Sequence, residues 1–167
     1  MSNKIDLIKS VFSAADCEIV GRIRLQKMFY LFEQLIPDDK FAFSYHHYGP
    51  YSSELSSVIS MMIFDESIKE EAISNSFGGV YYKYSIVDTK TDSDPVAELS
   101  AEKSSEFAKR MKEETSVVIE LAATIHWLKH HESINDWENE LKARKANKAT
   151  DERIKQALSL LSDLDMS

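Results

Sequence analysis

The stretch from residue 21 to residue 36 has the apolar spacing of one broad helix face. It reads GRIRLQKMFYLFEQLI, and its apolar residues recur at steps of three and four, which places them on one side of a helix. This pattern predicts an amphipathic helix that begins after Gly21 and stops at Pro37. The residues expected on its apolar face are Leu25, Met28, Phe29, Phe32, Leu35 and Ile36.

An aromatic segment, FAFSYHHYGPYSSEL, follows this helix. Phe41, Phe43 and Tyr45 alternate with smaller or polar residues, which predicts a short strand. The YGPYSS part is predicted to be a turn, and Ser52 or Ser53 is expected to cap a third helix. The buried stripe expected on this third helix is Leu55, Val58, Ile59 and Met62.

Two further patterns complete the N-terminal half. Residues 3–15 have helical apolar spacing. Residues 71–76, the turn 77–79 and the run Val80–Val87 form a strand–turn–strand pattern, which predicts a β-hairpin. Three helices, a short strand and a hairpin predict a winged-helix-like arrangement over residues 1–88.

The C-terminal half is expected to be helical. Residues 89–98 are polar and are predicted to be a linker loop, and residues 99–167 have helical spacing throughout. Ser133 and Asp136 have the spacing of a capping box, and Thr150 is placed to cap the last helix. The two halves are expected to pack as one unit, so the predicted fold is α+β and mostly α. The stripe expected in the middle helix is Val118, Leu121, Ala122, Ile125 and Leu128.

The order helix, aromatic strand, YGPYSSEL and helix resembles the YwgA-like family of uncharacterised bacterial and archaeal proteins. The segments ELAATIHWL and DERIKQALSLL also fit that family, so the resemblance spans nearly the whole chain. The family lies close to the Panacea domain that is found in antitoxins. The resemblance implies this fold and a place in bacterial conflict or defence, and it implies no particular reaction.

Charge and cysteine content indicate the setting of the protein. The chain has 167 residues, a single cysteine and a formal net charge of −8. Cys17 has no intramolecular partner, which fits a reducing cytosol. The N-terminal MSNKIDLIKSVF alternates charged and apolar residues, so neither a signal peptide nor a membrane span is expected. An acidic chain is repelled by phosphates, which disfavours nonspecific nucleic-acid binding and favours protein partners.

Tyrosines and cations near the aromatic turn and the hairpin are the candidate partner-binding residues. Tyrosine offers a large contact area with few rotatable bonds and is common at interface hot spots. Alternation along the second hairpin strand is expected to turn Tyr82 and Tyr84 toward the core, and Tyr81 and Lys83 outward. The candidates are Tyr48, Tyr51, Tyr81, Lys83, Arg22 and Arg24.

These groups also have structural interpretations. The tyrosines of YGPYS could brace the turn, whose glycine permits a tight reversal. The cations that begin the second helix, including Lys27, could be paired within the protein, and the carboxylates considered as their partners are Asp16, Glu18 and Glu54. A basic segment near the C-terminus is expected to be a solvated helix end and loop, with contact to nucleic acid or an acidic partner as the alternative. This segment carries Lys142, Arg144, Lys145 and Lys148.

Other function classes have weaker support. The third helix, SSELSSVISMMIF, contains no basic residue, whereas helix-turn-helix readers use Arg, Lys, Asn or Gln to contact bases. A winged-helix transcriptional regulator is therefore not the preferred function and is kept as the alternative. His126 and His130 lie four residues apart, either as a pair of metal ligands or as an exposed helix end, and the second interpretation is preferred. No nucleophile–base set or phosphate loop is recognisable, so no catalytic residue and no cofactor are predicted.

The sequence thus predicts a non-enzymatic, cytoplasmic protein-interaction module. Its partner is expected to be a toxin or a larger defence subunit. The chain would act as an antitoxin-like neutraliser or as an accessory subunit of an anti-phage complex, for example one built around an SMC-like ATPase. The defence setting comes from the resemblance alone.

Overall fold

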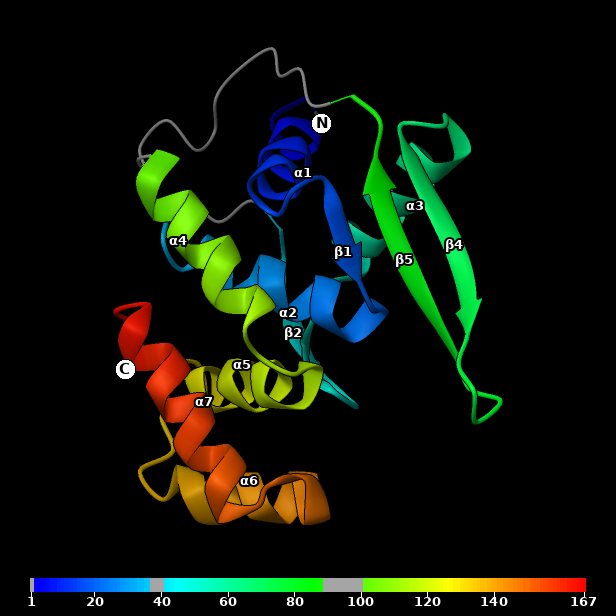
Figure 1. The fold of residues 1–167 in the computed structure, drawn as a ribbon. Helices are drawn as coiled ribbons and strands as arrows, with labels where there is room; N and C mark the ends of the chain where they lie inside the picture. The colour runs from blue at the N-terminus through cyan, green and yellow to red at the C-terminus, as the bar shows by residue number, and fades with distance from the viewer. Residues whose placement is uncertain (1, 37–40, 89–100) are drawn as a thin grey trace.

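A computed structural model describes residues 2–36, 41–88 and 101–167 and shows an α+β fold in which helices predominate (Figure 1). The helices of these ranges are α1 (Ser2–Ala14), α2 (Arg22–Glu33), α3 (Ser53–Phe64), α4 (Ala101–Lys112), α5 (Ser116–His130), α6 (Trp137–Lys145), the 3-10 helix η1 (Ala146–Lys148) and α7 (Asp151–Asp163). The strands are β1 (Glu18–Val20), β2 (Ser44–His46), β3 (Gly49–Tyr51), β4 (Ile68–Ser74) and β5 (Val80–Ile86).

Helix α2 lies at the centre of the molecule. Every residue from Leu25 to Glu33 is buried, so the helix is covered on all sides and not only along its apolar face. The predicted helix was too long at its C-terminal end, because α2 stops at Glu33 and its last carbonyls bond to the N–H groups of the following turn. The burial of polar residues within α2 explains why several of them have specific partners in the groove described below.

The wing is a three-stranded antiparallel sheet with the order β1-β5-β4. In the hairpin, Ile68 is opposite Ile86 and Ser74 is opposite Val80. Strand β1 adds to the other side of β5, with Glu18 opposite Ser85. The order α1, β1, α2, α3, β4, β5 is winged-helix-like, as predicted, although β1 itself was not anticipated.

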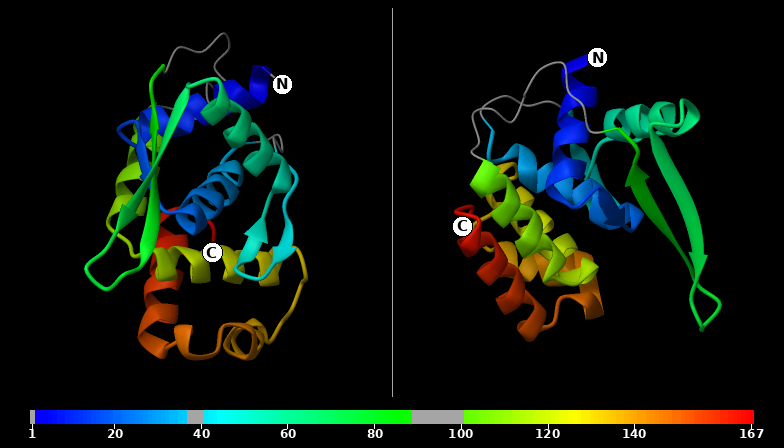
Figure 2. Two further views of the ribbon diagram at one scale, coloured as in Figure 1. Left: turned by 90° about the vertical axis from the view of Figure 1, so that its right-hand side faces the viewer. Right: turned by 45° about the horizontal axis from the view of Figure 1, so that its top comes forward.

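The hairpin β4–β5 projects away from the helices toward its tip (Figure 2). At its base Tyr84 and Ile86 are buried, as the alternation predicted, and Tyr82 is half-buried. Nearer the tip the same strand face leaves the core, so Val80 is 56% exposed, and Phe77 at the turn is 96% exposed. The projecting part of the hairpin is therefore held by strand pairing and not by burial.

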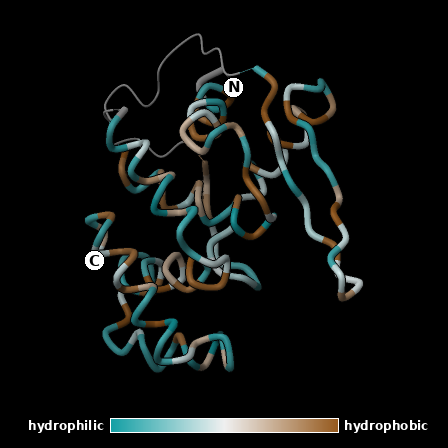
Figure 3. The backbone as a smooth tube through the Cα atoms, in the orientation of Figure 1, coloured by the Kyte–Doolittle hydropathy of each residue, from teal (hydrophilic) through white to brown (hydrophobic). Residues whose placement is uncertain are grey.

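The C-terminal half packs directly on the N-terminal half. Helix α5 contacts α2 and strand β3 on one side and α6 and α7 on the other, and α4 contacts α1. The predicted stripe of α5 is fully buried, and the buried residues of both halves form one hydrophobic cluster. In Figure 3 brown and teal segments alternate along the helices, as expected for helices with one face in a core.

Two helix starts agree with the predicted caps. The Ser52 hydroxyl accepts a hydrogen bond from the Leu55 N–H at 3.0 Å, and the Thr150 hydroxyl accepts one from the Arg153 N–H at 3.3 Å. Each bond satisfies an N–H group that has no partner within its helix. The four residues predicted as the buried stripe of α3 are the buried residues of that helix, so its orientation was correctly predicted.

Other local predictions need correction. The capping box does not form, because the Asp136 side chain accepts from the Asn139 side chain at 2.8 Å and makes no cap bond to α6. Ser133 has a positive φ of 52° in the preceding loop. The predicted linker 89–98 lies outside the described residues.

A buried hydrogen bond joins the two halves. The Tyr30 hydroxyl of α2 lies 2.8 Å from Nδ1 of His126 on α5, and His126 is only 8% exposed. The preferred interpretation of the histidine pair as an exposed helix end is therefore wrong for His126. Its ring also lies against that of His130, with 4.5 Å between the ring centroids. Within the described ranges, no group of three or more His, Cys, Asp and Glu side chains could hold a metal ion.

We expect this histidine to make the protein less stable in mild acid. Burial, together with the neighbouring His130, His131 and Lys129, lowers the pKa of His126 to about 4. Because the unfolded imidazole titrates near 6.5, the unfolded state binds more protons between these two values. The free energy of unfolding is therefore undiminished by His126 above about pH 6.5, and it falls as the pH drops toward 4. Denaturant titrations should give a free energy of unfolding about 2 kcal/mol lower near pH 5 than near pH 8.

His126→Gln is the matched control for this pH dependence, since the amide can still bond to Tyr30 but does not titrate. In this variant the difference between the two pH values should shrink by most of that 2 kcal/mol. An unchanged pH dependence in His126→Gln would show that other groups control the acid response.

Candidate interaction groove

A groove of about 1000 Å³ lies between the hairpin β4–β5 and the smaller hairpin β2–β3. In the left view of Figure 2, α2 lies between these two hairpins, and the first residues of α2 form part of the groove wall. Helix α3 contributes Ser56, Ile59, Ser60 and Ile63 to it. The groove thus combines elements from the wing, the central helix and the aromatic segment, and its size is that of a typical ligand site.

The structure brings five of the six candidate partner-binding residues to this groove. The residues that line it include Arg22, Arg24, Tyr48, Tyr51 and Tyr81. Tyr48 and Tyr81 are 45% and 41% exposed, so their rings remain available for contact. Candidates that are up to sixty residues apart in the sequence therefore share one surface.

The sixth candidate, Lys83, does not line the groove. Its ammonium lies 3.6 Å from the Glu18 carboxylate on the adjacent strand β1. Lys83 is half-buried, and its ammonium group is paired within the wing. The structure therefore separates Lys83 from the other candidates.

The aromatic segment folds as a hairpin and not as the strand followed by a turn that was predicted. Strand β2 pairs with β3, with Tyr45 opposite Pro50 and His46 opposite Gly49, so the chain reverses at His47-Tyr48 and Gly49-Pro50-Tyr51 is extended. Gly49 has a φ of +102°, which favours glycine, and Pro50 is buried. The reversal carries His47 and Tyr48 to the rim of the groove.

Gly49 packs against helix α5 with no room for a side chain. A Cβ atom at this position would lie 2.6 Å from the Thr124 hydroxyl, which is bonded to the Glu120 carbonyl at 2.9 Å. We expect Gly49→Ala to lower the free energy of unfolding by about 1–3 kcal/mol from the backbone conformation alone, with a further loss from the contact with Thr124.

Gly78→Ala is the control for Gly49→Ala. Gly78 also has a positive φ, of +81°, but a Cβ there would meet no atom within 4 Å. Chemical denaturation should therefore show a clearly larger loss for Gly49→Ala, and Thr124→Ala should restore part of it. Equal losses at the two glycines would contradict the close packing of the β2–β3 hairpin on α5.

Arg22 is presented at the groove by two tyrosines of the wing. Its guanidinium stacks on the Tyr82 ring at 3.7 Å, and its Nε donates to the Tyr84 hydroxyl at 3.3 Å. The bond to Tyr84 raises the pKa of Arg22, while burial raises the pKa of Tyr84 to about 12. The remaining ion pair is long, 3.9 Å from Nη2 to the Glu70 carboxylate, and 61% of the arginine side chain is exposed. One edge of the guanidinium is thus fixed while much of it faces solvent.

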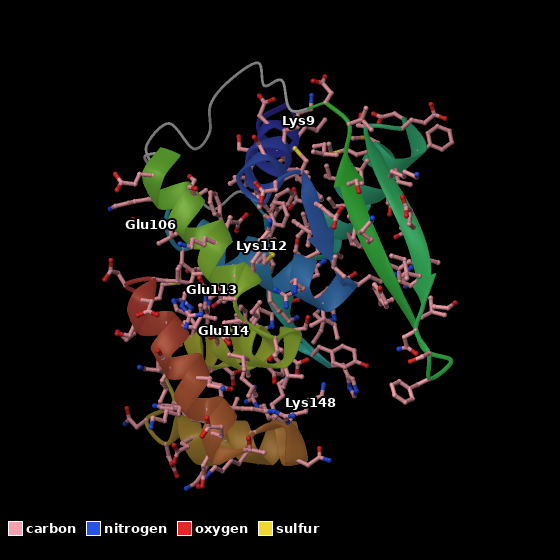
Figure 4. The ribbon with its side chains drawn as sticks, viewed as in Figure 1. Lys9, Glu106, Lys112, Glu113, Glu114 and Lys148 are labelled. Atoms are coloured by element: carbon pink, nitrogen blue, oxygen red, sulfur yellow. The ribbon has the colours of Figure 1, made fainter. Side chains whose placement is uncertain are left out.

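Arg24 has a structural role beside the groove. Its two Nη atoms donate to the carbonyl oxygens of Met111 and Glu114 at 2.8 and 2.6 Å, at the C-terminal end of α4. Met111 lies in the last turn of α4, and a cation at a helix C-terminus suits the helix dipole. Figure 4 shows Glu114 at this end of α4. The contact ties α2 to the C-terminal half.

The ion pairs proposed for these cations were wrong. Each of the three carboxylates considered has a different partner: Asp16 pairs with Lys112, Glu18 with Lys83 and Glu54 with Lys4. Spacing along the chain suggested partners close in sequence. The partners of the two arginines instead lie 48 to 92 residues away, on the wing and near the end of α4, which pack beside α2.

Lys27 lies beneath the groove in a buried polar network. It is 2% exposed and donates to the Pro50 carbonyl at 2.6 Å, which joins α2 to strand β3. Burial first, and then the nearby Lys145, lower the pKa of Lys27 to about 8, against an opposing effect of Glu120. The ammonium therefore remains mostly charged near neutral pH. In the same region the Gln26 amide bonds to both backbone groups of Ser52.

The centre of this network is Glu120 of α5, which is 2% exposed. Its carboxylate accepts from Lys145 at 2.9 Å and from Lys148 at 3.3 Å. Lys145 is itself buried, so the basic segment is not the solvated helix end that was predicted. Its other cations are paired as well, Arg144 with Glu132 and Lys142 with Asp151.

The same basic segment holds the β2–β3 hairpin. The Lys148 ammonium lies 5.0 Å from the centre of the Tyr48 ring, and the Arg144 guanidinium lies 4.6 Å from that of Tyr45. Figure 4 shows Lys148 beside α6. A cation over an aromatic face is attracted by the quadrupole of the ring. These contacts therefore fix one wall of the groove to the C-terminal half.

The burial of several site residues was not predicted from the sequence. Lys27 and Gln26 fall within the apolar stretch of α2, where polar residues are normally expected on an exposed side. Glu120 lies in the segment SVVIELAATI, where it is the only charged residue. A charge inside such an apolar run is a signal for a buried ion pair, because burial without a partner is costly.

Comparison with known proteins supports the sequence resemblance. No protein-family model matches the chain. The uncharacterized protein YwgA of Bacillus subtilis (strain 168) is 28% identical over 161 residues, which cover 94% of this chain and 93% of YwgA. The chain is similar to YwgA along almost its whole length. This similarity supports a YwgA-like family. No helix in the described ranges is both long and apolar enough to cross a bilayer.

Proposed function

We propose that this protein is a non-catalytic interaction module whose protein partner docks in the groove between the two hairpins. The observation that carries the proposal is the convergence of Arg22, Tyr48, Tyr51 and Tyr81 on one surface. Tyrosine and arginine are among the residues most enriched at the energetic centres of protein interfaces. A groove that presents both is well suited to hold a partner.

The polar groups of the groove favour binding over catalysis. Arg24 bonds to helix carbonyls, Lys27 bonds to the Pro50 carbonyl, and Gln26 bonds to the Ser52 backbone. These side chains are committed to holding the walls together. What the groove offers to a partner is mainly tyrosine rings, the exposed side of Arg22 and the histidines of the β2–β3 hairpin.

We place this module in bacterial conflict or defence, as an antitoxin-like neutraliser or an accessory subunit of an anti-phage complex. Support comes from the YwgA-like motifs and from the nearness of that family to the antitoxin-associated Panacea domain. The partner would be a toxin or a larger defence subunit, such as an SMC-like ATPase.

Tyr81→Ala should weaken partner binding by about 1–3 kcal/mol while leaving the melting temperature almost unchanged. The ring is 41% exposed and borders the groove, so the folded protein gains little from it. Tyr82→Ala should mainly reduce stability, because Tyr82 is half-buried and carries the stacked Arg22 side chain. The measurement is quantitative capture of the native-host partner by tagged variants, together with thermal melts.

Phe64→Ala is the control for Tyr81→Ala. Phe64 is 90% exposed, but it lies outside the groove at the end of α3. Capture that depends on Phe64 but not on Tyr81 would move the interface away from the groove. If partner capture were lost only on substitutions in α6 and α7, the interface would lie in the C-terminal half.

A further inference from the structure

We infer that the groove accepts an acidic segment of a partner protein, with carboxylates directed toward Arg22 and apolar side chains placed among the tyrosines. This inference rests on the proposed interaction function and specifies the chemistry of the partner. It depends on the distribution of charge, on the geometry of Arg22 and on the apolar part of the groove wall.

The groove is positive on a protein that is negative overall. Three cations line it, Arg22, Arg24 and Lys27, and Glu70 is the one carboxylate among its described lining residues. This gives a surplus of two positive charges at the groove, while the whole chain has a formal net charge of −8. A positive cleft in a negative surface steers an acidic ligand to one place.

Part of this positive charge is buried and therefore persistent. Beneath the β2–β3 hairpin the Glu120 carboxylate faces the ammonium groups of Lys145 and Lys148, and Lys27 is close enough to interact with both Glu120 and Lys145. Three ammonium groups around one carboxylate leave an excess of positive charge under the groove. Salt screens buried charges much less than surface charges, so this excess acts on a docked segment at physiological ionic strength.

Arg22 is oriented to receive a carboxylate. The stack on Tyr82 and the bond from Nε to Tyr84 hold one part of the guanidinium, which lowers the entropy lost when a ligand binds. Its contact with Glu70 is long, and more than half of the side chain is exposed. Guanidinium–carboxylate bonds are charge-assisted and stronger than neutral hydrogen bonds.

The rest of the wall suits apolar side chains. Ile59, Ile63 and Val80 line the groove together with the tyrosines, and Val80 is 56% exposed. A peptide that carries apolar residues among acidic ones would match both features. Nucleic acid fits less well, because tight binding requires several phosphate contacts and Arg22 is the cation that the groove exposes most.

Selection from a random peptide library displayed on phage tests this chemistry without knowledge of the natural partner. The full chain is the bait, and peptides that also bind the Val80→Glu variant are removed, because that substitution adds a carboxylate to the groove. We expect the remaining peptides to be net negative with apolar residues. Synthetic copies should bind Arg22→Gln about tenfold more weakly than wild type, the loss typical of a charge-assisted bond. Lys83→Gln, on the wing but outside the groove, should bind them as wild type does.

Three results would overturn the inference. Selected peptides that are neutral or basic yet still depend on Tyr81 and Val80 would leave protein docking intact but exclude the acidic ligand. Peptide affinity that is equal in wild type and Arg22→Gln would exclude the carboxylate contact. Tighter binding of a single-stranded oligo-dT, lost in Arg22→Gln, would assign the groove to nucleic acid. Thermal melts of Arg22→Gln and Val80→Glu show whether each variant is folded, and both positions are exposed enough for small effects.

Discussion

Replacing Glu120 by Gln is expected to lower the free energy of unfolding by about 3–5 kcal/mol. The carboxylate is buried and neutralises the buried Lys145, whose side chain is 4% exposed. Without it, an ammonium group would remain in the interior beside Lys148 and Lys27 with no opposing charge. Removing one partner of a buried ion pair is costly for this reason, whatever the net contribution of the intact pair. Denaturant titration of the single variant gives the value.

Two variants control the Glu120 experiment. Glu140→Gln breaks the half-buried pair with Arg144 on α6 and should cost no more than about 0.5 kcal/mol, because this pair lies at the surface and not in the interior. The double variant Glu120→Gln/Lys145→Met removes the stranded ammonium of Lys145 and should recover part of the loss. A loss below about 1 kcal/mol in Glu120→Gln would mean that the network is not the buried junction described above.

Phe32→Ala should also cost about 3–5 kcal/mol. Phe32 is 1% exposed on α2, and its ring meets the ring of Phe107 on α4 edge to face, with 5.2 Å between centroids. The substitution would open a cavity between the N-terminal and C-terminal halves. Since typical domains have a total stability of only about 5–15 kcal/mol, the melting temperature should fall sharply.

Tyr48→Ala is the comparison for Phe32→Ala, and here the structure changes the expectation from sequence. The sequence left open that Tyr48 braces the aromatic turn as a buried side chain, but this side chain is 45% exposed and its ring contacts Lys148 at the rim of the groove. A loss within about 1 kcal/mol is now expected. Similar losses for Phe32→Ala and Tyr48→Ala would show that the core has been placed wrongly.

Elements with a strong periodic pattern and a local cap could be predicted from the sequence. The α3 stripe from Leu55 to Met62 and the Thr150 cap were correct because both depend on residues three or four apart. The wing hairpin was predicted because its strands flank a glycine turn, although its first strand is Ile68–Ser74 and not residues 71–76. Strand β1 was missed because three residues are too few to show a period, and it exists only by pairing with β5.

The candidate site shows a similar division. The tyrosine-rich segments indicated which residues could meet a partner, and five of the six candidates lie at one groove. Their inner partners could not be predicted, because Arg24 reaches carbonyls about 90 residues away and Glu120 bonds to lysines 25 and 28 residues away. Such contacts depend on how helices pack, which no local pattern contains.

Photo-cross-linking in the native host tests the central claim most directly. A photoreactive amino acid is placed at Val80 or Tyr48 within the groove, or outside it at Phe64 or at the exposed Lys155 of α7. We predict a discrete cross-linked protein from the two groove positions and none from the other two. The same product from Phe64 or Lys155, with nothing from Val80 and Tyr48, would contradict the groove as the partner-binding surface.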